Sequence, residues 1–311
     1  MNYQYQDYQL VQDHIVQTPV ISNADLDKEL KAQLFFKCEN LQCTGSFKYR
    51  GAMYALLKLD AGSRAKGVVT VSSGNHGAAL ARAGQTLGIQ VTVIVPKDIN
   101  PVKLNNIQQY SAEIIFADSG MQGRQEALAQ FFSCQQALFI PPYNHHDIVF
   151  GQASSAYELI EQQPDLDYLI VPIGGGGLAS GSILAAQTFN SRLKVVGAEP
   201  ANADDAFQSM LTGKLIEHNN PDTVCDGLKA SLGDLTFPII RDGIEDIMLV
   251  SEQDIIAAMK YLHQKLKMLI EPSSAIVYAA VLKHKQRFEN KKVGLILSGG
   301  NLDLEKFYSD C

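Results

Sequence analysis

The sequence has few basic residues, no long apolar run and no paired cysteines. Of its 311 residues, 26 are Lys or Arg and 33 are Asp or Glu, which gives a net charge of −7. Nucleic acids and anionic membranes are bound by concentrated positive charge, so neither is expected as a partner. No apolar stretch reaches the roughly 20 residues that span a bilayer, and the N-terminus lacks the basic start and apolar core of a signal peptide. We therefore expect a cytoplasmic protein.

The five cysteines do not form a metal-binding or disulfide pattern. They are scattered at positions 38, 43, 134, 225 and 311, with no CxxC pair. Cys38 and Cys43 are spaced loosely like half of a zinc site, but Cys134 and Cys225 stand alone and provide no second half. We expect reduced thiols, the usual state of cysteines in the cytosol.

What the chain does contain is a regular alternation of strand and helix patterns. Apolar and β-branched runs predict strands at 34–37, 68–71, 91–95, 113–116, 137–140, 168–171, 194–198, 247–250 and 293–297. Helical patterns are found at 4–16, 48–57, 78–87, from 101 onward, and at 152–161, 252–267 and 273–283. Strands that alternate with helices predict right-handed βαβ units and parallel sheets. The length is sufficient for two α/β lobes, each with its own core.

A run of four glycines, Gly174, Gly175, Gly176 and Gly177, follows a predicted strand and opens a predicted helix. Glycine lets the backbone approach a phosphate closely, and the helix N-terminus attracts the negative charge. Two interpretations stay open for this motif alone. It suits the phosphate of a cofactor, but Gly174, Gly176 and Ala179 also fit a dinucleotide-binding G-x-G-x-x-A pattern, with Glu199 placed as a ribose-binding acid.

Two further segments favour an aldehyde cofactor over a dinucleotide. Lys48 lies within Ser-Phe-Lys at the start of a predicted helix, and Ser72 to Gly77 reads Ser-Ser-Gly-Asn-His-Gly at the end of a predicted strand. An aldehyde cofactor needs one amine with which to condense and polar groups that orient its ring. Dinucleotide binding gives neither segment a role. We therefore predict that Lys48 carries pyridoxal 5'-phosphate as a Schiff base.

These segments together resemble the fold-type II pyridoxal phosphate enzymes of the serine racemase and serine/threonine dehydratase family. The similarity covers essentially the whole chain and includes residues 46–52, 72–77, 174–178, 199–205, 226–227, 271–272 and 297–301. It implies an α/β fold with two lobes, similar to the tryptophan synthase β subunit, in which each lobe is a mainly parallel sheet flanked by helices. The expected large cofactor-binding domain comprises residues 1–66 and 145–311, and the expected small mobile domain comprises residues 67–144.

The resemblance also implies a role for each cofactor-binding residue. Lys48 is the Schiff-base lysine, Phe47 packs on the cofactor ring, and Asn75 bonds the phenolic oxygen. Ser298 faces the pyridine nitrogen, and Gly227 and Glu271 complete the site. The phosphate is expected on Gly174, Gly175, Gly176, Gly177 and Leu178.

The expected reaction is the dehydration of a β-hydroxy amino acid to a 2-oxo acid and ammonia. Lys48 removes the α-proton, with a pKa that burial lowers. A hydroxyl at Ser298 does not hold a proton on the ring nitrogen as a carboxylate would, which suits β-elimination. Ser73 stands where racemases of the family carry a serine on the opposite face of the substrate, so serine racemisation is also expected.

The substrate is expected to lie with its carboxylate on residues 72–76, which are Ser72, Ser73, Gly74, Asn75 and His76. Tyr143 belongs to a loop that resembles the threonine dehydratase version. Arg124 falls near the site in racemases and suits a second carboxylate, which keeps 3-hydroxyaspartate dehydration open as an alternative. Two other classes also stay open: a nicotinamide oxidoreductase and a catalytically silent cofactor-binding protein.

The family resemblance further implies a divalent cation and a homodimer. Glu199, Asp205 and the carbonyl of Ala203 are hard oxygen ligands suited to Mg²⁺, Ca²⁺ or Mn²⁺ rather than zinc. Asp204 is read as a solvated or capping residue, and the pair His145 and His146 as part of a loop. The expected partners are a small amino-acid substrate, a second copy of the chain and a nucleotide effector.

Overall fold

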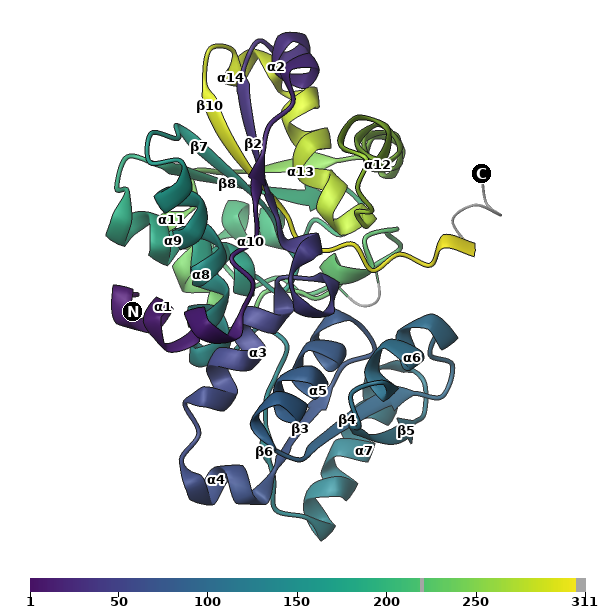
Figure 1. Ribbon diagram of the computed structural model, residues 1–311. Coiled ribbons are helices and arrows are strands. Elements are labelled where there is room, and N and C mark those ends of the chain that lie inside the picture. The colour runs from purple at the N-terminus through teal and green to yellow at the C-terminus, as the bar shows by residue number, and fades with distance from the viewer. Residues whose placement is uncertain (219–220, 306–311) are drawn as a thin grey trace.

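The structure, a computed structural model, describes residues 1–218 and 221–305, and its strands form two sheets (Figure 1). The six-stranded sheet has the order β1 (Val20–Ile21), β2 (Gln33–Cys38), β10 (Lys292–Leu297), β7 (Tyr168–Pro172), β8 (Lys194–Pro200), β9 (Asp246–Val250). The four-stranded sheet has the order β5 (Glu113–Ala117), β4 (Val91–Pro96), β3 (Val68–Val71), β6 (Leu138–Phe139). We call the first sheet with its helices the large lobe and the second with its helices the small lobe.

The α-helices fill the intervals between the strands. They are α1 (Tyr5–Val11), α2 (Ala24–Leu30), α3 (Lys48–Leu57), α4 (Ala61–Lys66), α5 (Asn75–Leu87), α6 (Pro101–Gln108), α7 (Gly120–Cys134), α8 (His146–Gln162), α9 (Gly177–Phe189), α10 (Asp205–Thr212), α11 (Thr236–Gly243), α12 (Glu252–Leu266), α13 (Pro272–Lys283) and α14 (Lys285–Phe288). Short 3₁₀ turns are η1 (Gln12–His14), η2 (Glu39–Leu41), η3 (Cys43–Gly45) and η4 (Asp226–Leu228).

Both sheets are parallel except where β1 pairs with β2. In the large lobe, α12 and α13 pack in the core on one side of the sheet, and α8 and α9 pack in the core on the other. The strands are therefore buried on both faces, which explains why they read as continuous apolar runs rather than as alternating patterns. The alternation of strands and helices predicted this arrangement correctly.

The helices differ from the sequence-based prediction in several places: α5 begins at Asn75 rather than at 78, and α2, α4, α11 and α14 were not predicted. The predicted helix at 4–16 is the shorter α1 followed by η1. The helix predicted to begin near 152 begins at His146, so His146 is helical rather than part of a loop. His145 is the N-cap of this helix, and its ring accepts the N–H of Asp147 at 3.2 Å. An imidazole is an uncommon N-cap, so no capping residue marks this helix start in the sequence.

A fully buried charge cluster lies beside α3. The guanidinium of Arg50 bonds to Glu39 at 2.6 Å and to Glu158 at 2.8 Å, and the ammonium of Lys37 bonds to Glu158 at 2.6 Å. All four side chains are at most 1% exposed. Because η2, β2, α3 and α8 each contribute one of them, the cluster fixes α3 against the large lobe.

The parallel topology brings the candidate residues to neighbouring strand ends. The segments that begin at Ser72, at Gly174 and at Ser298 follow the carboxyl ends of β3, β7 and β10. In open α/β sheets, ligands bind outside these ends. Figure 1 shows α3 and α5 at the junction of the two lobes, and α3 packs on both α5 and α8.

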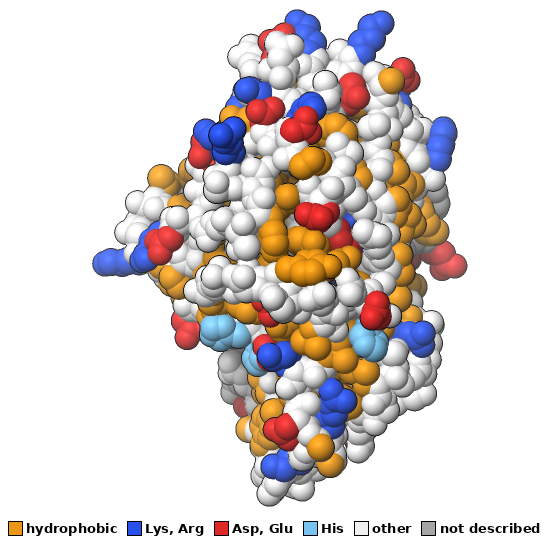
Figure 2. Space-filling model, turned by 60° about the vertical axis from the view of Figure 1, so that its left-hand side comes forward, with side chains coloured by type: hydrophobic (Ala, Val, Ile, Leu, Met, Phe, Trp, Pro, Cys, Tyr) orange, Lys and Arg blue, Asp and Glu red, His pale blue; other side chains and the backbone are white. Residues whose placement is uncertain are grey.

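Two surface properties bear on possible partners. On the face in Figure 2, acidic and basic side chains are interspersed, and no large patch of one charge is visible. Within residues 1–218 and 221–305, no helix combines the length and the apolar character needed to cross a membrane.

Candidate active site

Lys48 is the first residue of α3 and has an unusual environment for a lysine. Its Nζ donates to the carbonyl of Pro142 at 2.8 Å and lies 5.1 Å from the centre of the Phe47 ring. No carboxylate among the described residues is within ion-pair distance of it. Burial lowers the pKa of this amine to about 8, against a smaller opposing effect from Glu271. The amine is thus partly neutral near neutral pH, as a condensing or proton-abstracting group must be.

The backbone around Lys48 is tied to the end of β10. Ser46 forms an isolated antiparallel bridge with Gly299, and the N–H of Phe47 donates to the carbonyl of Ser298 at 3.0 Å. Gly45 has a φ of +71°, and a Cβ there would lie 2.6 Å from Oδ1 of Asn301. The glycine therefore permits both the turn and the close approach of the two segments.

Asn75 joins the two lobes through side-chain hydrogen bonds. Its Nδ2 donates to Glu271 Oε1 at 2.9 Å, and its Oδ1 accepts from Asn301 Nδ2 at 2.8 Å. Burial raises the pKa of Glu271 to about 7, although the bond from Asn75 opposes this shift. Asn75, Glu271 and Asn301 thus form one hydrogen-bonded group of two amides and a carboxyl group. Asn301 was not among the predicted site residues, although it lies in the same turn as Ser298.

Ser298 is buried directly after β10, where the sequence predicted a hydroxyl facing the cofactor ring. Its Oγ lies 3.2 Å from Oγ of Ser274 and donates to the carbonyl of Ser273 at 3.3 Å. Ser274 also donates to the carbonyl of Gly299 at 2.5 Å. The side chain is therefore held in place by α13, and no carboxylate bonds to it among the described residues.

The glycine turn leaves backbone donors without protein acceptors. Among the described residues, none accepts the N–H of Gly174, Gly175 or Gly176. Gly176 has a φ of +82° and caps the N-terminus of α9, so a side chain there would be strained. A Cβ on Gly175 would lie 2.4 Å from the ring of Tyr143, and one on Gly174 would lie 3.0 Å from the carbonyl of Gly227. Orphan donors at a helix start fit a phosphate group.

The segment after β3 forms a turn that is built by Ser72. Its Oγ accepts the N–H of Gly77 at 3.2 Å and that of Gly74 at 3.4 Å. Ser73 is partly exposed. His76 is buried, and its Nε2 donates to the carbonyl of Ile140 at 3.1 Å. Burial and the charge of Lys48 lower the pKa of His76 to about 3, so the ring is neutral and has a supporting role.

Arg124 is the predicted substrate residue that the structure does not join to the others. Its Nε donates to the carbonyl of Gly120, one turn earlier in α7, at 2.9 Å. Pro142 was not predicted, because a backbone carbonyl gives no residue-specific signal.

Glu199 and Asp205 lie near each other after β8. Glu199 accepts the N–H groups of Ala206 and Phe207, and thereby caps α10. Burial raises the pKa of Glu199 to about 9 and that of Asp205 to about 6. Oδ2 of Asp205 is buried without a partner, and Ala203 is fully buried between the two. In the described part of the chain, no three His, Cys, Asp or Glu side chains are grouped to hold a metal.

Asp204 and the cysteines have ordinary surroundings. Asp204 is the N-cap residue of α10, as one of the two interpretations expected, although its side chain makes no cap bond and pairs with His218 at 2.9 Å instead. Cys38, Cys43, Cys134 and Cys225 are free thiols, as predicted, and Cys311 lies outside the described residues.

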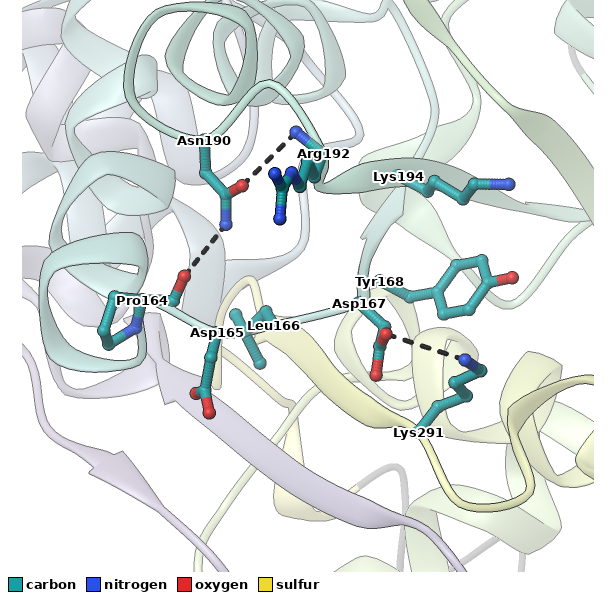
Figure 3. A pocket seen from close by; sticks show the side chains of 9 residues that line it. All are labelled: Pro164, Asp165, Leu166, Asp167, Tyr168, Asn190, Arg192, Lys194 and Lys291. Atoms are coloured by element: carbon teal, nitrogen blue, oxygen red, sulfur yellow. Dashed lines mark hydrogen bonds and ion pairs between the residues drawn. The ribbon is translucent and has the colours of Figure 1, made fainter.

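One hollow of the large lobe lies away from these residues (Figure 3). It has a volume of about 520 Å³ and is lined at the amino ends of β7 and β8 by Tyr168, Arg192 and Lys194 among others. This edge of the sheet is opposite to the one that carries Lys48 and the glycine turn, so we do not assign the hollow to the active site.

Comparison with known proteins agrees with the geometry of Lys48 and the glycine turn. Residues 11–299 match the family described as pyridoxal-phosphate dependent enzyme. The chain belongs to this family. It is a fold-type II member, and its relatives are racemases and ammonia-lyases. The dinucleotide interpretation of the glycine turn was therefore wrong, and Glu199 is used to cap α10 rather than to bind a ribose.

Three relatives illustrate the similarity. The chain is 42% identical to a serine racemase of Dictyostelium discoideum over 298 residues, which are 94% of this chain and 92% of the relative. It is 39% identical to an L-threo-3-hydroxyaspartate ammonia-lyase of Saccharomyces cerevisiae over 96% of this chain and 91% of the relative. The structure of maize serine racemase superposes with a TM-score of 0.95 at 39% identity, covering 98% of this chain and 94% of that one.

Proposed function

We propose that this enzyme dehydrates L-serine to pyruvate and ammonia and also interconverts L- and D-serine. The observation that carries the proposal is Lys48, a partly buried amine with a lowered pKa and no carboxylate partner among the described residues. It bonds to the carbonyl of Pro142, and the next residue, Tyr143, lies against the glycine turn at Gly175. The serine racemases among its relatives support the choice of substrate.

The residues fit pyridoxal 5'-phosphate, which when bound supplies an electron sink in conjugation with the amino group of the substrate. Lys48 would hold it covalently, residues 174–178 would hold its phosphate, and Asn75 and Ser298 would orient its ring beside Phe47. Gly227 lies against Ser273: its N–H donates to the Ser273 hydroxyl at 3.2 Å, and a Cβ there would lie 3.1 Å from that oxygen. Glu271 contributes through Asn75, which it holds by hydrogen bonds.

The proton chemistry is assigned to two groups on opposite sides of the substrate. Lys48 Nζ removes or returns the α-proton on its own side, since its pKa near 8 leaves a neutral fraction at physiological pH. The hydroxyl of Ser73 would serve the other side, which racemisation needs and elimination does not. The N–H groups and side chains of the turn at 72–76 would bind the substrate carboxylate, with His76 as a neutral support.

Dehydration of 3-hydroxyaspartate is the second candidate. The observation in its favour is that relatives at 39% identity are named L-threo-3-hydroxyaspartate ammonia-lyase and beta-hydroxyaspartate dehydratase. This substrate has a second carboxylate, which needs a cation. To provide the positive charge, the side chain of Arg124 would have to give up its bond to the carbonyl of Gly120 in α7. Tyr143 would limit the space beside the glycine turn.

We also propose a divalent cation at Glu199, Asp205 and the carbonyl of Ala203. Two buried carboxylates with raised pKa values, one of them with a buried oxygen that has no partner, are an unfavourable arrangement unless a cation neutralises them. Oxygen ligands of this kind suit Mg²⁺, Ca²⁺ or Mn²⁺.

We further infer that residues 67–144 move as a small domain against residues 1–66 and 145–311. Contacts that cross between the lobes, such as Lys103 with Asp226 at 2.5 Å and Asn100 with Asp303 at 2.8 Å, would close the site over substrate. A homodimer is supported by exposed apolar side chains on the N-terminal segment, among them Tyr5, Leu10 and Val16. A nucleotide effector and a cytoplasmic location stay predictions from the sequence.

The proposal is tested by incubating the holoenzyme with L-serine and Mg²⁺ and measuring D-serine and pyruvate in the same sample. We expect both products, and we expect Ser73→Ala to lose D-serine while retaining pyruvate. Pyruvate without D-serine in the unmodified enzyme would contradict the racemase assignment. If neither product forms, while L-threo-3-hydroxyaspartate yields oxaloacetate, the second candidate is correct.

A further inference from the structure

The glycine turn is held from one side by Thr236, which none of the preceding assignments includes. Thr236 is the first residue of α11 and is fully buried. Its hydroxyl donates to the carbonyl of Gly175 at 2.9 Å, and a second carbonyl, that of Gly233, is farther away at 3.4 Å. The hydroxyl oxygen also accepts the N–H of Gly233 at 2.9 Å, which directs its proton toward Gly175.

This bond orients the peptide between Gly175 and Gly176. A trans peptide is planar, and its C=O and N–H point in opposite directions. Because Thr236 holds the C=O of Gly175, the N–H of Gly176 points to the other side of the turn. The side facing α11 is closed, since a Cβ on Gly176 would lie 2.7 Å from Leu232 and 3.0 Å from Thr236. The N–H of Gly176 is one of the donors that have no acceptor among the described residues.

The residues preceding Thr236 connect the turn to the carboxylate pair. Ser231 Oγ accepts the N–H of His218 at 3.0 Å, and the ring of His218 pairs with Asp204, the neighbour of Asp205. The Ser231 hydroxyl and the Leu232 N–H also lie near enough to Asp205 to oppose the rise of its pKa. Leu232 is buried and packs on Gly176. Residues 231–236 therefore contact the candidate cation site at one end and the candidate phosphate site at the other.

The same segment is fixed to the chain that crosses between the lobes. Asn144 donates to Asp234 at 2.7 Å and accepts the N–H of Leu235 at 3.0 Å. Gly233 approaches Asn144 so closely that a Cβ there would lie 2.1 Å from its Oδ1. These contacts leave residues 233–235 little space on the side of Asn144.

We propose that Thr236 is a positioning residue for the cofactor phosphate, and that residues 231–236 make its position depend on a cation at Glu199 and Asp205. Thr236 touches neither substrate nor cofactor and acts through the N–H of Gly176. The inference rests on the proposed cofactor and cation sites. It adds a coupling between them, and by thermodynamic linkage each ligand must then tighten the binding of the other.

The first test compares Thr236→Val, Thr236→Ser and Thr92→Val in cofactor-free protein titrated with pyridoxal 5'-phosphate. Valine keeps the shape of threonine and removes the hydroxyl, so we expect the dissociation constant to rise about tenfold, which is ~1.4 kcal/mol. Serine keeps the hydroxyl and should restore the affinity to within about twofold of the unmodified protein. Thr92 is a buried threonine of β4 that bonds only to Glu113, and its variant should bind the cofactor normally.

A second readout separates positioning from general destabilisation. The ³¹P resonance of the bound cofactor reports the surroundings of the phosphate, and it should shift in Thr236→Val but not in Thr236→Ser or Thr92→Val. Unchanged affinity together with an unchanged resonance in Thr236→Val would overturn the positioning role.

The coupling is tested by repeating the titrations with and without Mg²⁺, while Mg²⁺ binding is measured separately by calorimetry. In the unmodified protein we expect Mg²⁺ to lower the cofactor dissociation constant at least about fivefold. This ratio should fall to about one in Thr236→Val. It should also fall in Ser231→Ala, which alters the opposite end of the segment but keeps the Thr236 hydroxyl. An undiminished ratio in both variants would overturn the coupling, whereas unmodified protein that binds no cofactor would contradict the proposed function itself.

Discussion

The buried charge cluster beside α3 and the candidate site at the start of α3 contain the same kinds of ionisable residue, but only the charges of the cluster are paired within the protein. Arg50 and Lys48 are two positions apart in one helix. Arg50 bonds to two carboxylates, which raise its pKa despite burial. Lys48 bonds to one carbonyl, and its pKa falls to about 8. One cation holds the helix in place, and the other is left reactive.

The same contrast is found between two pairs of carboxylates. Glu39 and Glu158 share Arg50 and Lys37, and the pKa of Glu39 is lowered, since these cations outweigh the effect of burial. Glu199 and Asp205 have no cationic partner of this kind, and burial raises the pKa of both. Buried charges without a protein counter-ion are thus concentrated where we place the cofactor and the cation.

The largest effect is expected when Lys48, the reactive cation of this comparison, is removed. Lys48→Ala should reduce elimination and racemisation by at least about 10³-fold, because it removes both the covalent attachment and the proton-transfer group. Product assays with L-serine measure the loss. The free energy of unfolding should change by less than about 1 kcal/mol, since no ion pair is lost. Residual activity above a few per cent would contradict the role of Lys48.

The matched variant removes Arg50, the cation that holds the helix in place. Arg50→Met should lower the free energy of unfolding by about 3–5 kcal/mol, because it leaves Glu39 and Glu158 buried without their main partner. Denaturant titration of the cofactor-free protein measures this change. If Arg50→Met is as stable as Lys48→Ala, the ion pairs of Arg50 do not stabilise the fold, and the contrast between the two cations is wrong.

Removal of Mg²⁺ tests Glu199 and Asp205, the pair of carboxylates that we propose to bind the metal. At a Mg²⁺ concentration about 100 times its dissociation constant, the folded state should gain about 2.7 kcal/mol relative to metal-free protein. Thermal unfolding with and without a chelator measures the gain, and Asp205→Asn should abolish it. Glu39→Gln serves as a control, because its carboxylate is already paired and the response to Mg²⁺ should persist. If the Asp205→Asn variant is still stabilised by Mg²⁺, the metal binds at another site.

The smallest effect concerns pH. Only the neutral form of Lys48 condenses with an aldehyde, and its pKa is lowered to about 8 from the 10.5 of an ordinary lysine. The neutral fraction rises as pH increases, so the rate of cofactor attachment should rise about tenfold per pH unit below 8 and level off above it. Stopped-flow absorbance of cofactor-free protein measures this rate. A rate that continues to rise to pH 10 would show that the pKa of Lys48 is not lowered.

Much of the site was predictable because chemistry-bearing residues follow strands that the sequence marks clearly. Ser72, Gly174 and Ser298 come directly after apolar runs, and parallel strands bring such positions to one edge. The boundaries of β3 were predicted to the residue, and those of most other strands to within one or two.

The remainder depends on contacts that leave no local pattern. Thr236 is an ordinary helix start in the sequence, and its bond to Gly175 crosses 61 positions. The structural role of Arg50 has no local signal, because its partners Glu39 and Glu158 lie 11 and 108 positions away in the chain. The start of α8 at His146 was missed, since the cap is a histidine following two prolines.

The most direct test of the account is to fix the cofactor on the protein by borohydride reduction and to identify the modified peptide by mass spectrometry. Lys37 is fully buried and pairs with Glu158, whereas Lys48 is partly buried and bonds only to a backbone carbonyl among the described residues. We predict that the reduced cofactor is found on Lys48 and not on Lys37, and that Lys48→Ala leaves the protein unlabelled. Labelling of Lys37 or of any other lysine in place of Lys48 would contradict the central claim.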